Sequence, residues 1–187
     1  MIISKNASRA DNQQERLMMI GWIIGFVDGE GCFSINFVKQ TDKQEKSRIR
    51  KGYKIGLQIT HRFAVVQSEK SIDVLKELHK FFGVGDLYVN RRHDNHKENL
   101  FRYSVSKRQD LMKVIIPFFQ KNPLKTSKQN DFNLFVKCVE LMDKKEHLTK
   151  KGAIKIAQLC EKMNQQKPKT DIIRILRDHT PKPLSKG

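Results

Sequence analysis

The sequence predicts an α+β domain in which an antiparallel sheet carries helices on one face. Segments with alternating apolar and polar residues occur in pairs, segments with helical spacing lie between the pairs, and all fit in one chain of 187 residues. Paired strands interleaved with helices favour a single antiparallel sheet that is covered by helices. The other face of such a sheet can meet water or a ligand.

Four segments alternate with the period of two that is typical of half-buried strands. In the first of them, Phe33, Ile35 and Phe37 occupy every second position. A charged turn is expected over 39–51 and a hairpin loop over 92–99. The expected strands cover 32–38, 53–62, 85–92 and 100–106.

Six segments place apolar residues at helical spacing. The second begins at Ser68, a residue type that caps helices, and stops at Gly83, which suits a helix end. The third is expected to end at Pro117, because proline removes a helical hydrogen bond. Residues 1–14, ahead of the first helix, are expected to form a frayed polar leader. The expected helices cover 15–27, 68–82, 107–116, 131–146, 149–165 and 170–177.

The charge balance favours a polyanionic partner. The chain has 37 Lys and Arg, 20 Asp and Glu, and a formal net charge of +17, and such an excess raises self-repulsion in the compact state. DNA, ribosomal RNA and an anionic membrane surface all match this charge, which leaves the kind of polyanion open.

Cysteine content and hydropathy argue against other classes. Three cysteines without C-x-x-C spacing disfavour a disulfide framework or a zinc site and favour a reducing, intracellular compartment. The apolar run at 17–27 contains two glycines and is shorter than the roughly 20 residues of a membrane span. The polar segment before it lacks a signal-type cleavage pattern, so the protein is not expected to be secreted.

The segment that ends the first expected helix is the most unusual in the chain. Gly21 and Gly25 lie four residues apart on one helix face and cost about 1 kcal/mol each against alanine, which suggests that another backbone approaches there. Asp28 and Glu30 follow at the negative pole of the helix, where carboxylates are disfavoured. A divalent cation held by carboxylate and carbonyl oxygens would explain them; a glycine cap with solvated acids is the alternative that the spacing leaves open.

The segment Ile23-Ile-Gly-Phe-Val-Asp-Gly-Glu-Gly31 resembles the motif after which the LAGLIDADG homing endonucleases are named. It differs in the isoleucines at its first two positions and in the glutamate as final acid. The order of strands and helices is also similar to one family domain, as are Phe82-Gly-Val-Gly85 and Pro123-Leu-Lys-Thr-Ser-Lys-Gln129. The resemblance covers 15–146 as an endonuclease core and leaves 147–187 as a C-terminal helical extension with a basic tail.

The resemblance implies an αββαββα fold with additional C-terminal helices, and a motif helix that packs against its counterpart through Gly21 and Gly25. A single motif in the chain implies a homodimer. Glu30, assisted by the carbonyl of Gly29, would bind catalytic Mg²⁺ or Mn²⁺, with Ca²⁺ as a non-cleaving substitute and no small-molecule cofactor. Asp28 would have a structural role next to the site.

Three further residues match positions of the family's active site. A lysine before the helix that follows the fourth strand fits Lys128 best, with Lys125 as the alternative. A polar residue near the end of the second strand fits His61, which differs from the glutamine often found there. Each of these residues also has a plain interpretation as a solvated surface group.

The uncovered face of the expected sheet is rich in hydrogen-bonding side chains and poor in acids. A two-stranded ribbon fits the major groove of DNA and reaches base edges with such side chains. A homodimer would read a pseudo-palindromic site. The candidate DNA-binding residues are Ser34, Asn36, Gln40, Lys54, Gln58, Thr60, Tyr88, Asn90, Arg92, Arg102 and Ser104.

The sequence therefore predicts a sequence-specific double-strand DNA endonuclease of the intron homing type. The alternatives are a DNA- or RNA-binding protein on the same fold that does not cut, such as an intron RNA maturase or a regulator, and an unrelated basic module such as a ribosomal protein. The family setting implies an organelle, chloroplast or mitochondrion, in a eukaryote and the cytoplasm in a prokaryote.

Overall fold

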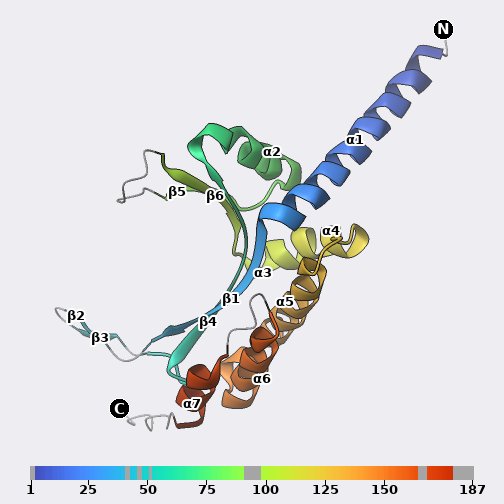
Figure 1. Cartoon of the computed structure of the whole chain (residues 1–187). Coiled ribbons are helices and arrows are strands. Elements are labelled where there is room, and N and C mark those ends of the chain that lie inside the picture. The colour runs from blue at the N-terminus through green and yellow to red at the C-terminus, as the bar shows by residue number, and fades with distance from the viewer. Residues whose placement is uncertain are drawn as a thin grey trace. The chain divides into compact units, whose positions relative to one another are not determined.

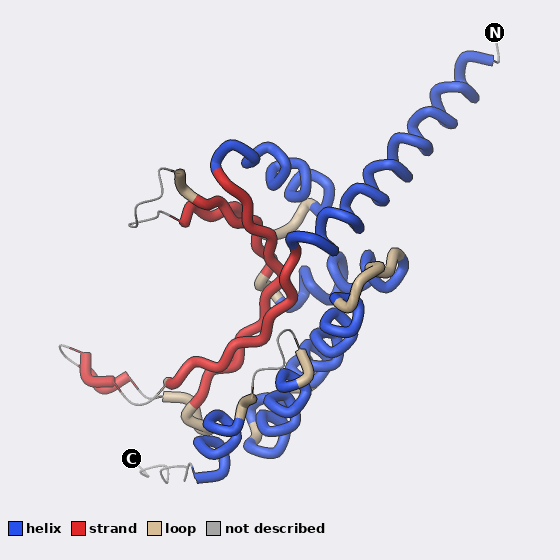
Figure 2. The backbone as a smooth tube through the Cα atoms, in the orientation of Figure 1, coloured by secondary structure: helices blue, strands red, loops and turns tan. Residues whose placement is uncertain are grey.

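The computed structural model describes residues 3–40, 43–45, 48–50, 52–90, 98–163 and 168–178. Four strands form an antiparallel sheet in the order β1-β4-β6-β5, which confirms the predicted α+β class (Figures 1 and 2). The chain divides into two compact units: the first consists of Met1–Cys32 and Ala64–Gln129, the second of Phe33–Phe63 and Asn130–Gly187. The strands are β1 (Gly31–Lys39), β4 (Leu57–Ser68), β5 (Asp86–Asn90) and β6 (Leu100–Val105).

The first helix is much longer than predicted. Helix α1 spans Ile3–Glu30, so most of the expected polar leader is helical and the acidic end of the motif does not break the helix. The physical reason lies in the sequence, because residues 3–20 contain neither glycine nor proline. Residues 12–18 are all exposed, and α1 extends past the rest of the first unit toward the N-terminus (Figure 1).

The second strand begins later than predicted. Residues 53–56 form a turn in which Gly56 adopts a positive φ of 71° and donates its N–H to the Tyr53 carbonyl at 2.8 Å. The turn therefore replaces the expected start of the strand at Tyr53. The expected charged turn over 39–51 contains a small ribbon of β2 (Lys43–Glu45) paired antiparallel with β3 (Arg48–Arg50).

In the first unit, helix α2 (Ile72–Phe82) packs against β5 and β6. A short 3₁₀ turn, η1 (Glu69–Ser71), precedes it, and Ser68 makes no side-chain cap, contrary to the prediction. Gly83 ends α2 as predicted, with φ of 66° and its N–H bonded to the His79 carbonyl at 2.9 Å.

Pro117 does not end a helix. Helix α3 (Arg108–Asp110) continues through a π-helical segment, η2 (Leu111–Ile115), into α4 (Ile116–Lys121), and Pro117 lies in the first turn of α4. A first-turn position needs no helical N–H, and the wider π turn accommodates the ring. The helix therefore runs past the proline.

The second unit is built on α5 (Lys128–Asp143) and α6 (Lys150–Glu161), with α7 (Thr170–Asp178) and the 3₁₀ turn η3 (Glu146–Leu148). Its core contains the ring of Phe33, which lies 5.1 Å from the rings of both Phe63 and Phe132. The three cysteines are free thiols. Among the described residues, no helix combines the length and apolar character needed to cross a membrane.

Candidate active site

The C-terminal end of α1 carries the motif acids, and one face of the helix fixes them in place. Ile23 and Val27 are fully buried in the first unit, because they lie four residues apart on the same side of the helix. The opposite side, which includes Gly21, Gly25 and Gly29, is exposed. The helix is therefore anchored along one stripe and open along the other.

The Asp28 carboxylate ties the end of α1 to the segment that precedes α5. Its Oδ2 accepts the backbone N–H groups of Lys125 at 2.7 Å and Thr126 at 3.0 Å, and its Oδ1 accepts the Thr126 hydroxyl at 2.5 Å. Burial raises the pKa of Asp28, but the Thr126 hydroxyl, the two backbone N–H groups and the charge of Lys128 lower it by more. The pKa thus lies below its ordinary value, and the ionised carboxylate holds the segment.

Asp28→Asn is expected to lower the melting temperature at neutral pH, because the replacement weakens all three hydrogen bonds. A carboxyl group whose pKa is lower in the folded than in the unfolded chain stabilises the fold fully above the unfolded value of about 3.9. This contribution is lost as the pH falls through the folded value. Thermal unfolding from about pH 7 to pH 2 should show a difference between the two proteins that narrows below about pH 4; a constant difference would contradict the assignment.

Lys128 is the lysine that reaches the end of the motif helix. Its Nζ donates to the carbonyls of Val27 at 3.0 Å and Gly29 at 3.1 Å, which are among the last carbonyls of α1. A cation at this negative pole is electrostatically favoured. For Lys125, the described contact to the motif is through its backbone N–H, so the geometry favours Lys128 of the two candidates.

Glu30 differs from Asp28 in being free. Its side chain is exposed and, within the described part of the chain, has neither a hydrogen bond nor an ion pair. Gly29, beside it, has an exposed backbone. One carboxylate and one carbonyl are hard oxygen ligands that suit Mg²⁺ or Ca²⁺, but they are too few for a complete site. No group of three or more His, Cys, Asp or Glu side chains that could hold a metal ion occurs among the described residues.

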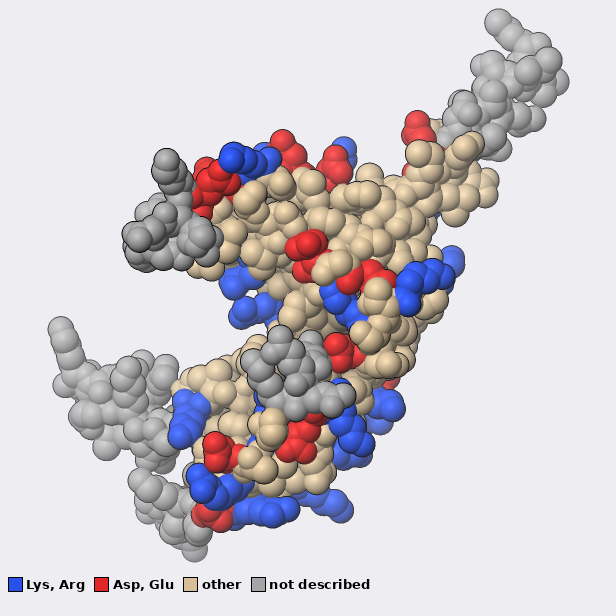
Figure 3. All heavy atoms as spheres, viewed as in Figure 1, with Lys and Arg blue, Asp and Glu red and all other residues tan. Residues whose placement is uncertain are grey.

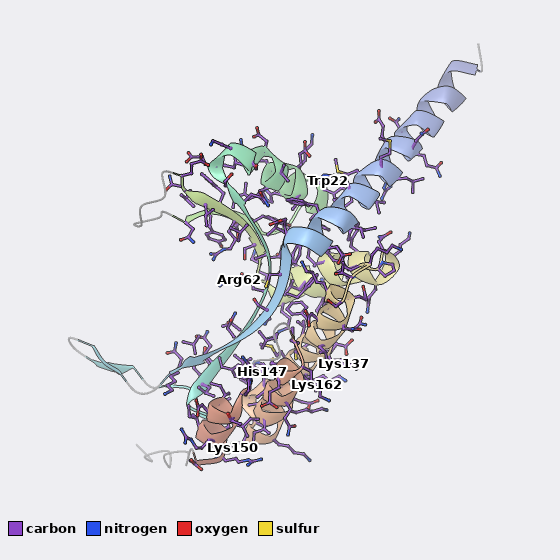
Figure 4. All side chains as sticks on the ribbon, in the orientation of Figure 1. Trp22, Arg62, Lys137, His147, Lys150 and Lys162 are labelled. Carbon is purple, nitrogen blue, oxygen red and sulfur yellow. The ribbon has the colours of Figure 1, made fainter. Side chains whose placement is uncertain are left out.

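His61 does not lie where the sequence predicts it. It sits in the middle of β4, seven residues before the strand ends at Ser68, because the strand starts and ends later than expected. Both of its ring nitrogens are buried, and alternation along the strand gives it the same face as the buried Ile59 and Phe63. Arg62 points to the other side, away from α5 (Figure 4).

The glycines of α1 are not required by the chain's own packing. A Cβ added at Gly21 or Gly25 would meet no atom within 4 Å. The same side of the helix exposes large apolar residues, with 67% of Met18 and 37% of Trp22 accessible, and the Trp22 ring stacks on Phe26 with 5.1 Å between the ring centres. We call the stripe of Met18, Gly21, Trp22, Gly25 and Gly29 the open face of α1.

Apart from Ser104, the predicted DNA-binding residues fall into three groups. Asn36, Tyr88 and Asn90 are exposed on strands, and Ser34, Gln58, Thr60 and Arg102 are partly exposed there. Gln40 and Lys54 lie in the connection between β1 and β4 rather than on a strand. Arg92 lies outside the described residues.

Ser104 is only 4% exposed, so its assignment to the DNA-reading surface is wrong. It lies opposite Asp86 in the β5–β6 ladder, at the end of the pair where Gly85 comes close. A Cβ on Gly85 would lie 2.7 Å from the Ser104 carbonyl oxygen, which illustrates how tightly the backbone packs there.

Two residues of this site were not singled out in the sequence. Thr126 bonds Asp28 and also accepts the N–H of Lys128 at 3.2 Å, and Gln129 accepts the N–H of Leu124 at 2.8 Å through its side chain. Both lie inside the segment 123–129 that carries part of the family resemblance. That segment was the available signal, but its role as the anchor of Asp28 depends on a contact across 98 residues.

Comparison with known proteins decides the family. The profile of the LAGLIDADG endonuclease family matches residues 23–139, from the motif helix into α5. The chain belongs to this family. It is 34% identical to the probable intron-encoded endonuclease 2 of Neurospora crassa over 140 residues, and this match covers 74% of this chain and 26% of the relative. It is 33% identical over 131 residues to an uncharacterized 50.9 kDa protein in ND4 intron 1 of Podospora anserina, covering 69% and 25%.

The chain thus spans about a quarter of the length of these two relatives. Among solved structures, the homing endonuclease I-TnaI is 36% identical with a TM-score of 0.66, over 84% of this chain and 95% of that one. I-SmaMI, solved on its uncleaved DNA target with calcium ions, is 32% identical with a TM-score of 0.67, over 86% of this chain and 49% of that one. The LAGLIDADG homing-endonuclease fold is therefore confirmed.

Proposed function

We propose that this LAGLIDADG chain is a DNA endonuclease that acts as a homodimer and hydrolyses one phosphodiester in each strand of a long pseudo-palindromic site. The observation that carries the proposal is the contrast between its two motif acids. Asp28 is occupied by three hydrogen bonds to the segment 125–126, whereas Glu30 is exposed and without a partner among the described residues. An acid kept free beside a backbone carbonyl is what a metal-dependent nuclease needs.

Glu30 and the carbonyl of Gly29 are the residues that would hold the metal ion, which we propose to be Mg²⁺ or Mn²⁺. The donor set suits such ions because both ligands are oxygen atoms. A bound divalent ion would activate water and offset the negative charge at the scissile phosphate. Within the described part of the chain, one free carboxylate lies at this position, so we expect a second copy, the DNA and water to complete the ligand set.

Lys128 is proposed to offset charge at the reacting phosphate. Its ammonium group lies 3.1 Å from the Gly29 carbonyl, next to Glu30 in the sequence, and a flexible lysine in this place can exchange a carbonyl for a phosphate oxygen. Thr126 and Asp28 fix the backbone from which Lys128 extends. The role of His61 stays a prediction that its buried ring nitrogens do not favour.

The homodimer is supported by the open face of α1. Glycines that the protomer does not need, together with exposed Met18 and Trp22, suit close packing against a second helix of the same kind. The match to I-SmaMI covers about half of that longer chain, whereas the match to I-TnaI covers nearly all of it. These lengths fit a domain that works in pairs.

The test is cleavage of a library of long randomised duplexes by the 187-residue chain in Mg²⁺, with and without EDTA. We expect double-strand breaks at one pseudo-palindromic sequence that disappear with EDTA, because the oxygen ligands alone do not activate water. Binding in Ca²⁺ should weaken steeply as salt rises, since phosphate contacts release counterions. Tight, salt-dependent binding without any break in Mg²⁺ or Mn²⁺ would contradict the proposal and favour a binding or splicing role.

A further inference from the structure

Two side chains on the β5–β6 pair, Tyr88 and Arg102, contact each other outside the buried core of the protein. In the ladder Tyr88 lies directly opposite Arg102, so both side chains lie on the same face of the pair. The Arg102 guanidinium carbon sits 5.3 Å from the centre of the Tyr88 ring. The Tyr88 hydroxyl in turn donates to Asp86 Oδ2 at 3.4 Å.

This face of the pair is the one that α2 leaves uncovered. The alternate residue Tyr103 is fully buried on the other face, where its ring packs near His79 and Phe82 of α2. The outer surface of η1 and α2 carries acidic and basic side chains side by side (Figure 3), and its Lys70 and Lys76 are paired with Glu98 and Asp73. A polyanion would therefore meet the Tyr88–Arg102 face rather than the helix side of this unit.

Arg102 itself has donors to spare. The side chain forms no ion pair or hydrogen bond with any other described residue, and since its Nε is buried, the two terminal amino groups are the donors that it can offer. A guanidinium carries five N–H donors in a rigid plane. The guanidinium is planar, lies against an aromatic ring and has no acceptor among the described residues. It can therefore donate two parallel hydrogen bonds to a pair of acceptors that lie in one plane.

We propose that Arg102 reads a guanine through its O6 and N7 atoms, one in each half-site, and that Tyr88 is the positioning residue that holds the guanidinium plane. The proposal rests on the proposed function, since it assumes a duplex along this face. The pairing is geometric, because arginine reaches O6 and N7 of guanine with two parallel hydrogen bonds in the major groove. A phosphate offers the same acceptor chemistry, so the experiment has to separate a base from a backbone contact.

The experiment selects bound sequences from a randomised duplex library in Ca²⁺, using the full chain and four variants. For the wild type we expect one guanine in each half-site, preferred roughly 5- to 150-fold over other bases. In Arg102→Gln the preferred base at that position should change to adenine, because glutamine pairs with its N6 and N7 atoms. All other positions should keep their preferences.

Tyr88 is tested by two replacements that differ in the ring. Tyr88→Phe keeps the aromatic face and should keep the guanine preference, whereas Tyr88→Leu should weaken it about 2- to 5-fold without changing the preferred base. A merely structural tyrosine would give the same base preferences in both variants. Lys76→Gln, which also removes one positive charge but on α2, is the matched control and should leave every position unchanged.

Three outcomes would overturn the inference. Arg102→Gln that binds all sequences more weakly with an unchanged preference would identify a phosphate contact instead. A guanine preference that survives in Arg102→Gln, with a melting temperature equal to wild type, would assign the position to another residue. A wild type that selects no sequence at all would overturn the proposed function, and the inference with it.

Discussion

Glu30→Gln is expected to abolish DNA cleavage while leaving DNA binding and stability intact. Glutamine keeps the size of the side chain but loses the charge that a divalent cation requires, so the cleavage rate should fall on the order of 10³-fold or more. The side chain is exposed and has no partner among the described residues, so the melting temperature should not change. Single-turnover cleavage of the selected site in Mg²⁺, together with binding in Ca²⁺, measures both effects.

Glu15→Gln is the matched control for this variant. Glu15 is an exposed acid on the same helix, outside the motif, and its replacement changes the net charge by the same amount. We expect cleavage at the wild-type rate. If Glu30→Gln cuts as fast as Glu15→Gln, the metal site lies elsewhere and the assignment of the motif acids is wrong.

The sequence predicted those parts of the fold that depend on local pattern. Alternation located β1, β5 and β6 within about two residues at each end, and the glycine at 83 correctly ended α2 with a left-handed residue. The prediction of a strand failed where a turn occurs in a segment whose residues also alternate between apolar and polar. Residues 53–56 alternate like a strand, but Gly56 takes a positive φ that only a turn requires, and the whole of β4 shifts along the chain.

That shift also explains the fate of His61. A strand that starts four residues later and runs to Ser68 turns a terminal position into a central one. The polar residue predicted at the strand end therefore carries ring nitrogens that are buried within the fold. The boundary moved by four residues, an even number, so no residue changed face, and the predicted alternation already gave His61 the same buried face as Ile59 and Phe63.

The candidate site was predicted in its residue types but not in its connections. Spacing alone does not separate Asp28 from Glu30, and only the family resemblance implied a structural role for Asp28 and a metal-binding role for Glu30. The contact of Asp28 with the segment 125–126 gives the structural role a physical basis. Likewise Lys125 and Lys128 differ in the fold, because one extends an ammonium group to the end of α1 and the other contributes its backbone.

Gly25→Leu is expected to dissociate the proposed homodimer and to stop cleavage, while making the isolated protomer more stable. Within the protomer a Cβ at this position meets nothing within 4 Å, and a helix former in place of glycine should stabilise α1 by about 0.5–1 kcal/mol. At a close helix contact the same side chain overpacks the interface by about 1–3 kcal/mol.

In a two-fold symmetric interface each substitution is present once in each protomer, so its effect on the free energy of association is doubled. The dimer should therefore weaken by about 2–6 kcal/mol, or roughly 30-fold to 10⁴-fold in its dissociation constant. Sedimentation across a range of protein concentrations measures this change. Thermal unfolding at a concentration where the wild type is monomeric measures the gain in protomer stability.

Gly25→Leu is expected to weaken association but to raise the stability of the protomer, and these opposite effects make the test specific. A variant that merely damages the fold would lose stability and association together, whereas a closed interface loses association alone. Lys137→Leu, at an exposed position of α5, introduces the same side chain away from α1 and should leave the dimer intact. Gly25→Leu that stays dimeric and cuts DNA would mean that the open face of α1 does not pack against its copy, and that the two Glu30 carboxylates meet by another arrangement.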